Sequence, residues 1–98
     1  MDAELILDKR DALADNAFQQ LVVWLLPRPL YLSTHFYKYR LALVVNKVCV
    51  MRYDNEAGKG DHKHIGDEQV PIDFADIPSL LSDFDADVER WFNEHGRD

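Results

Sequence analysis

Apolar positions over the first third of the chain cluster in a way that is typical of β-strands. Residues 4–9 and 17–26 are predicted to be extended, the second because β-branched and aromatic residues dominate it. The Pro-Arg-Pro segment at residues 27–29 stops this run and excludes regular strand pairing. Two early strands and an irregular connection are therefore expected before Phe36.

Two runs of strand-forming residues between Phe36 and Asn55 predict a β-hairpin. Asn46-Lys47 separates the runs, and asparagine tolerates the left-handed conformation that a tight turn requires. The sequence therefore predicts a central pair of antiparallel strands.

The register of this hairpin follows if the two residues that flank its turn pair with each other. Arg40 then lies opposite Tyr53, and Lys38 lies opposite Asn55. The two-residue period of a strand aligns Lys38 and Arg40 on one face, leading towards the segment after residue 55.

The periodicity changes near the C-terminal end, where a helix is predicted. Residues 70–74 are expected to add a short strand at the sheet edge, because Pro71 has no amide hydrogen to donate. Asp76 is a natural helix cap, and apolar residues then recur at three- and four-residue steps. We expect an α+β fold, an antiparallel β-meander of four or five strands with a C-terminal helix packed on one face, forming one domain over residues 1–98.

Composition favours a folded soluble protein, since 47% of the residues are apolar and 30% are charged. No apolar run approaches the roughly 20 residues of a membrane span, and the first residues are acidic where a secretory signal is basic. A cytoplasmic protein that does not cross a membrane is expected. Cys49 lies between valines and is predicted to be a buried structural thiol.

Charge is unevenly distributed along the chain. The net charge of −7 argues against a general binder of phosphate backbones. Residues 28–63 nevertheless hold seven Lys or Arg against three Asp or Glu, whereas residues 67–98 hold two against ten. The sequence therefore predicts a basic surface and an acidic one.

Residues 53–66 form the most plausible chemical site, a predicted loop rich in glycine, lysine and histidine. His62 and His64 lie on one side of an extended chain, as two metal ligands or an acid and a base require. The further ligands available to a metal are His35, Asp54 and Asp61. No second spaced pair of ligands is present, so no metal and no cofactor are expected.

Acid–base chemistry on a phosphodiester fits this segment better than zinc. Lys59, Lys63 and Arg40 can neutralise phosphate charge while a histidine moves the 2′-hydroxyl proton. Simpler interpretations remain open: two surface histidines in a polar loop, a solvated basic strand face, and Tyr53 as a core residue.

Five segments carry a further signal in their order along the chain. They are Ala-Glu-Leu-Ile at residues 3–6, Val23-Trp24 with Pro27-Arg28-Pro29, Ser33-Thr34-His35 with Tyr37-Lys38-Tyr39-Arg40-Leu41, Tyr53-Asp54-Asn55-Glu56 through Gly58-Lys59-Gly60-Asp61-His62, and Asp83-Phe84 with Asp87-Val88. Together they resemble the TumE family of bacterial toxin–antitoxin modules. The resemblance implies a small cytoplasmic toxin encoded beside an antitoxin that carries a helix-turn-helix DNA-binding domain.

We expect such a toxin to act on RNA as a metal-independent endoribonuclease, with the two histidines as base and acid. The candidate catalytic residues are His62, His64, Lys59 and Arg40, and the candidate substrate-binding residues are Lys38, Tyr53, Asn55 and Lys63. The alternatives are a non-catalytic toxin that occupies a ribosome or replication component and an adaptor protein that uses the acidic helix face. The sequence leaves the oligomeric state open.

Overall fold

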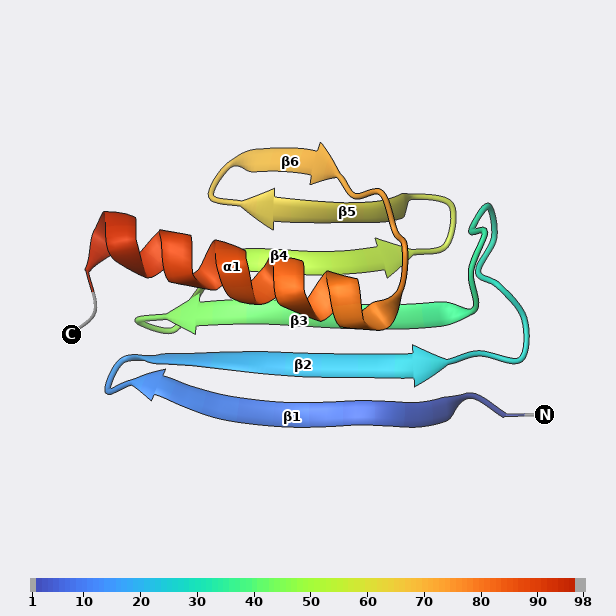
Figure 1. The fold of residues 1–98 in the computed structure, drawn as a ribbon, viewed down its shortest axis with the longest axis horizontal. Coiled ribbons are helices and arrows are strands. Elements are labelled where there is room, and N and C mark those ends of the chain that lie inside the picture. Colours follow the sequence, from blue (N-terminus) through green and yellow to red (C-terminus); the bar gives the residue numbers. More distant parts are fainter. Residues whose placement is uncertain (1, 97–98) are drawn as a thin grey trace.

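A six-stranded antiparallel sheet with one helix across it makes up the computed structural model, which describes residues 2–96 (Figure 1). The strands are β1 (Glu4–Ala14), β2 (Ala17–Leu25), β3 (Tyr37–Val45), β4 (Val48–Glu56), β5 (Gly60–Ile65) and β6 (Glu68–Pro71), and the helix is α1 (Ile77–His95). Each strand pairs with the next one in the chain. The predicted α+β meander with a C-terminal helix is confirmed, but the sheet has six strands rather than four or five.

The additional strand is β5, which lies within the segment predicted to be a loop. Its polar side chains are poor strand formers, yet its backbone pairs with β4 from Gly60 to Ile65. Gly58, Gly60 and Gly66 adopt positive φ angles of 81°, 76° and 60°, which allows the tight turns at both ends of β5. The last strand is Glu68–Pro71 rather than residues 70–74, and its predicted position at the sheet edge is confirmed.

The predicted register of the β3–β4 hairpin is wrong by one residue beyond its turn. Val45 pairs with Val48, but an irregularity between Leu43 and Val44 shifts the remaining pairs, so that Arg40 faces Asp54 and Leu41 faces Tyr53. A shift of one residue exchanges the two faces of a strand. Here it places the buried Tyr53 on the same face as Leu41, away from Arg40.

Helix α1 covers one face of the sheet and completes the core. It begins after Asp76, whose side chain accepts a hydrogen bond from the Ser79 amide at 2.7 Å, and it ends at Gly96 with a φ of 83°. Its buried residues Leu80, Phe84, Val88 and Phe92 belong to one cluster with buried residues of β2, β3 and β4. This apolar contact fixes the helix over the middle of the sheet (Figure 1).

The opposite face of the sheet, termed the open face, carries no helix (Figure 1). Cys49 lies next to the β3–β4 turn and pairs with Val44. The predicted burial of its thiol is wrong, since the side chain is exposed where no second layer covers the sheet. Within residues 2–96, no helix is both long enough and apolar enough to cross a membrane.

Candidate functional site

Polar side chains on the open face form two adjacent rows across the centre of the sheet. One row runs through Arg40, Asp54 and His62, and the other runs through Arg52 and His64, next to the small apolar Ala42 of β3. Because neighbouring strands lie about 4.8 Å apart, these side chains share one patch. We term Asp54, His62 and His64 the histidine cluster.

The histidine cluster is close-packed and largely buried. One potential ligand atom from each of its three residues lies within 4.8 Å of the others. The two imidazole rings meet edge to face with their centroids 4.9 Å apart. Asp54 and His62 are 7% and 6% exposed, whereas His64 is half-buried. The predicted placement of both histidines on one side of the chain is confirmed.

Both nitrogens of the His62 ring face oxygen atoms. Nδ1 lies 3.0 Å from the carbonyl oxygen of Gly60, and Nε2 lies 2.8 Å from Oδ1 of Asp54. His64, by contrast, has no hydrogen-bond partner among the described residues. The cluster is therefore asymmetric, with His62 held in place and the ring nitrogens of His64 free.

Arg52 flanks the cluster on the neighbouring row. Its Nε atom lies 2.8 Å from Oδ2 of Asp54, an ion-pair distance. Neither this contact nor the one between Asp54 and His62 has hydrogen-bond alignment, so Arg52 Nε and Asp54 Oδ1 are buried atoms without a hydrogen-bond partner in the described chain. Such atoms are uncommon in folded proteins, and a strained contact, a bound water or a bound ion each accounts for them.

His35 and Asp61, the other metal-ligand candidates from the sequence, lie with Tyr39 on the helix-covered face. Nδ1 of His35 accepts the Tyr37 amide hydrogen at 3.1 Å, so its Nε2 carries the hydrogen that faces Asp61 at 2.8 Å. The Tyr39 hydroxyl also donates to Asp61, at 2.7 Å, and burial together with this bond raises the tyrosine pKa. This pair is satisfied by its own neighbours and is separated from His62 by the sheet.

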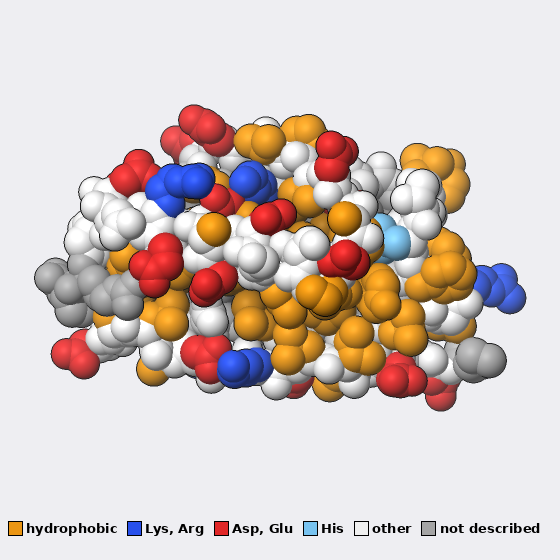
Figure 2. Space-filling view, in the orientation of Figure 1, with side chains coloured by type: hydrophobic (Ala, Val, Ile, Leu, Met, Phe, Trp, Pro, Cys, Tyr) orange, Lys and Arg blue, Asp and Glu red, His pale blue; other side chains and the backbone are white. Residues whose placement is uncertain are grey.

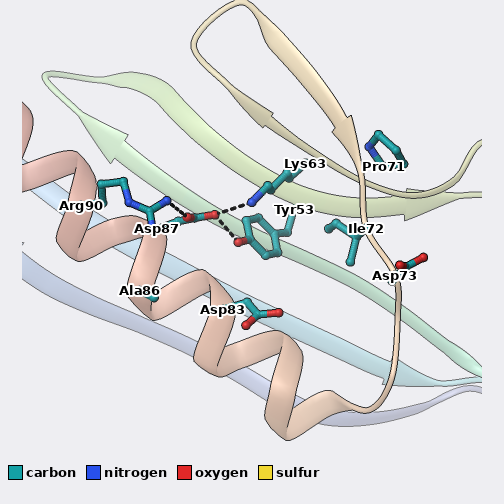
Figure 3. A pocket seen from close by; sticks show the side chains of 9 residues that line it. All are labelled: Tyr53, Lys63, Pro71, Ile72, Asp73, Asp83, Ala86, Asp87 and Arg90. Atoms are coloured by element: carbon teal, nitrogen blue, oxygen red, sulfur yellow. Dashed lines mark hydrogen bonds and ion pairs between the residues drawn. The ribbon is translucent and has the colours of Figure 1, made fainter.

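A charged network also occupies the helix-covered face, at the wall of a pocket between α1 and the segment after β6 (Figure 3). Asp87 accepts hydrogen bonds from the Tyr53 hydroxyl, from Lys63 Nζ at 2.9 Å and from Arg90 Nη1 at 3.0 Å. Burial and then the bond to Asp87 raise the pKa of Tyr53. Tyr53 and Lys63, both predicted to bind substrate, are thus engaged in holding α1 to the sheet.

At the open end of the β3–β4 ladder, the side chain of Asn55 makes the hydrogen bonds that backbone groups make elsewhere between these strands. Its Oδ1 accepts the Tyr39 amide hydrogen at 3.0 Å, and its Nδ2 donates to the Tyr37 carbonyl at 2.8 Å. The residue is 3% exposed. Its amide is therefore committed to joining the two strands.

Replacing Asn55 with alanine is expected to lower the free energy of unfolding by about 1–3 kcal/mol, because the buried Tyr39 amide and the partly buried Tyr37 carbonyl lose their partner. Urea denaturation of wild type and variant measures this difference. Asn93→Ala on the exposed surface of α1 is the matched control and should change stability by less than about 0.5 kcal/mol. Equal effects at both positions would contradict the assigned role.

The structure distributes the eight predicted site residues over different places. Four lie on the open face (Lys38, Arg40, His62 and His64), and three lie on the helix-covered face (Tyr53, Asn55 and Lys63). Lys59 lies in the β4–β5 turn, where its Nζ is 3.2 Å from Glu56. Arg52 was not among the predicted site residues, although its two-residue spacing from Asp54 on a strand places both side chains on one face.

A family model described as Toxin TumE matches residues 2–92 of the chain. The matched range includes all six strands and most of α1. No curated protein and no solved structure matches the chain.

Proposed function

Because this chain belongs to the TumE toxin family, we propose that it is the toxin of a bacterial toxin–antitoxin module and that it acts on RNA in the cytoplasm. An antitoxin with a helix-turn-helix domain neutralises it. The chain works as a single domain over residues 1–98, with the open face as its RNA-binding surface. The observation that carries the proposal is the histidine cluster beside cations that have no internal partner.

Exposed cations on the open face support RNA as the target. Lys38 and Arg40 are exposed, and neither side chain has an ion-pair partner within residues 2–96. Arg40 pairs across the strands with Asp54, so its side chain extends from a backbone position next to the histidine cluster. Free cations beside a polar site attract phosphate, and this attraction provides most of the affinity for nucleic-acid backbones.

The opposite face has a different charge. Figure 2 views the molecule from the side of α1 and shows acidic side chains spread over the helix, with hydrophobic ones gathered near its start. Acidic residues on α1 include Asp83, Asp85 and Glu94, all exposed. Such an acidic surface repels RNA. The uneven charge along the chain therefore favours RNA binding on the open face.

The histidine cluster supplies the chemistry of RNA cleavage in this proposal. His64 lies nearest to the scissile phosphate because its ring is half-buried and has free nitrogens, while Arg40 and Lys59 neutralise phosphate charge. His62 can act as an independent acid or base only by leaving the oxygen of Gly60 or of Asp54. Its first role is therefore to position Asp54 and His64.

Antitoxin binding has a simple physical basis on the same surface. An acidic segment or a helix laid over the open face would pair with Lys38 and Arg40 and would cover the histidine cluster. Covering these groups removes the site from RNA. Neutralisation then requires no change in the fold of the toxin.

Arg40→Gln is expected to weaken RNA binding and to reduce the slope of log affinity against log salt by about 0.7, the value for one lost phosphate contact on a single strand. Fluorescence anisotropy with a single-stranded RNA at several salt concentrations measures both quantities. Lys47→Gln, at the exposed β3–β4 turn, is the control and should leave them unchanged. An unchanged affinity in Arg40→Gln would remove the open face from the RNA-binding surface.

A further inference from the structure

We propose that the histidine cluster binds one divalent transition-metal ion, through Nε2 of His62, a ring nitrogen of His64 and Oδ1 of Asp54. This differs from the absence of a cofactor expected from the sequence. It goes beyond the proposed action on RNA and does not depend on the target of the toxin. Three observations carry it: the set of donor atoms, the partners of their outer atoms, and an unsatisfied carboxylate oxygen.

The donor atoms match a metal site in type and spacing. Two imidazoles and one carboxylate are ligands of Zn²⁺ and of other divalent first-row metals, and three protein ligands leave a position for water or substrate. The three donor atoms already lie within 4.8 Å of one another. They come from adjacent paired strands, where Asp54 faces His62 and the two histidines are spaced two residues apart on one face.

In His62 and Asp54, the nitrogen and oxygen atoms that point away from the proposed metal position have partners of the kind found in known metal sites. A histidine that binds a metal commonly donates its second N–H to a backbone carbonyl, which fixes the tautomer and the orientation of the ring. Nδ1 of His62 lies 3.0 Å from the carbonyl oxygen of Gly60 in this way. Oδ2 of Asp54 lies 2.8 Å from Arg52 Nε, which leaves Oδ1 for the shared position.

The third observation is Asp54 Oδ1 itself, which is buried and lies 2.8 Å from Nε2 of His62, yet has no aligned hydrogen-bond donor in the described chain. Asp54 as a whole is only 7% exposed. A buried acceptor without an aligned donor destabilises the folded protein, and a charged one does so more strongly. A metal ion at the position shared with His62 and His64 would remove this destabilisation.

The competing interpretation is an ion pair between Asp54 and a protonated His62, whose atoms approach to 2.8 Å. That pair would give His64 no role and would not satisfy Oδ1 by an aligned hydrogen bond. Arg52 acts against the metal by offsetting the charge of Asp54, so the neutral imidazoles must supply much of the affinity. Metal binding distinguishes the two interpretations directly.

The test is a titration of the full chain, purified without a histidine tag, with Co²⁺ and then Zn²⁺. We expect one equivalent of Co²⁺ to produce a visible absorption band that Zn²⁺ abolishes, and Zn²⁺ to raise the melting temperature. His64→Gln should weaken Co²⁺ binding by more than about 100-fold. Losing only a residue that hydrogen-bonds to a ligand already lowers metal affinity about 10–100-fold, and His64 is itself a ligand. The control His95→Gln, at the exposed end of α1, should bind as wild type does.

Asp54→Asn is the second variant, since it keeps the shape of the side chain and removes the charge. Weaker Co²⁺ binding in both variants, with circular dichroism unchanged, supports the site. No saturable band in wild type, or equal binding by wild type and both variants, overturns it. If the protein binds metal but leaves RNA intact, the metal site is supported and the RNA target is rejected. If it cleaves RNA but binds no metal, the RNA target is supported and the metal site is rejected.

Discussion

Replacing Asp87 with alanine is expected to lower the free energy of unfolding by about 1–3 kcal/mol, because the buried Tyr53 hydroxyl loses its acceptor and the partly exposed Lys63 loses its ion-pair partner. Asp87 is 6% exposed and accepts bonds from Tyr53, Lys63 and Arg90 (Figure 3). Its removal leaves the Tyr53 hydroxyl and the Lys63 ammonium without their common acceptor, at the point where α1 contacts β4 and β5. Chemical denaturation measures the difference.

Asp85→Ala is the matched control because Asp85 lies on the same helix and is exposed. It should change stability by no more than about 0.5 kcal/mol. A loss of less than 1 kcal/mol in Asp87→Ala would show that the network contributes little to the packing of α1.

The contribution of Asp87 also depends on pH. Burial acts to raise its pKa, but hydrogen bonds from Tyr53 and Lys63 and the charges of Lys63 and Arg90 lower it by more, so the pKa lies below its usual value. A lowered pKa in the folded state adds stability that is complete above the unfolded value of about 3.9 and is lost as the pH falls through the folded one. The difference in free energy of unfolding between wild type and Asp87→Ala should therefore become smaller below about pH 4.

Replacing either His62 or His64 with alanine is expected to abolish growth arrest on induced expression. Removing a group that transfers a proton, or the ring that holds it in place, reduces cleavage by about 10²–10⁴-fold, and we expect the remaining rate to be too low to arrest growth. Growth curves at matched protein levels measure the effect. His95→Ala, outside the cluster on α1, should remain as toxic as wild type.

His62 is buried, so its alanine variant must also be shown to fold. His64 is half-buried, and its replacement tests the chemistry with less disturbance of the sheet. Growth arrest by both histidine variants, each folded and equally expressed, would exclude the histidine cluster from the toxic activity.

The sequence predicted those parts of the fold in which local signals agree with the tertiary structure. The Asp76 cap and the apolar periodicity located α1, and the β-branched runs located β2, β3 and β4. Strand β5 was missed because its residues favour loops, and only its pairing with β4 makes it a strand. Tertiary pairing here overrides local propensity.

The candidate site was predicted only in part, for a related reason. The two-residue period was sufficient to place His62 and His64 on one face, but it could not reveal the bulge that exchanges the faces of β4. That single shift places Asp54 on the same face as Arg40 and Tyr53 on the face of the core, whereas the pairing of β4 with β5 brings Asp54 beside the histidines. A residue insertion in one strand has no signature in composition or hydropathy.

RNA cleavage by the histidine cluster is tested by incubating purified wild type and His64→Gln with total RNA, in a buffer containing Mg²⁺, Mn²⁺ and Zn²⁺. The wild-type preparation must be one whose expression arrests growth. We expect wild type to fragment the RNA and His64→Gln to leave it intact at equal concentration. Intact RNA with wild type, or equal fragmentation by both proteins, would contradict an RNA-cleaving site on the open face.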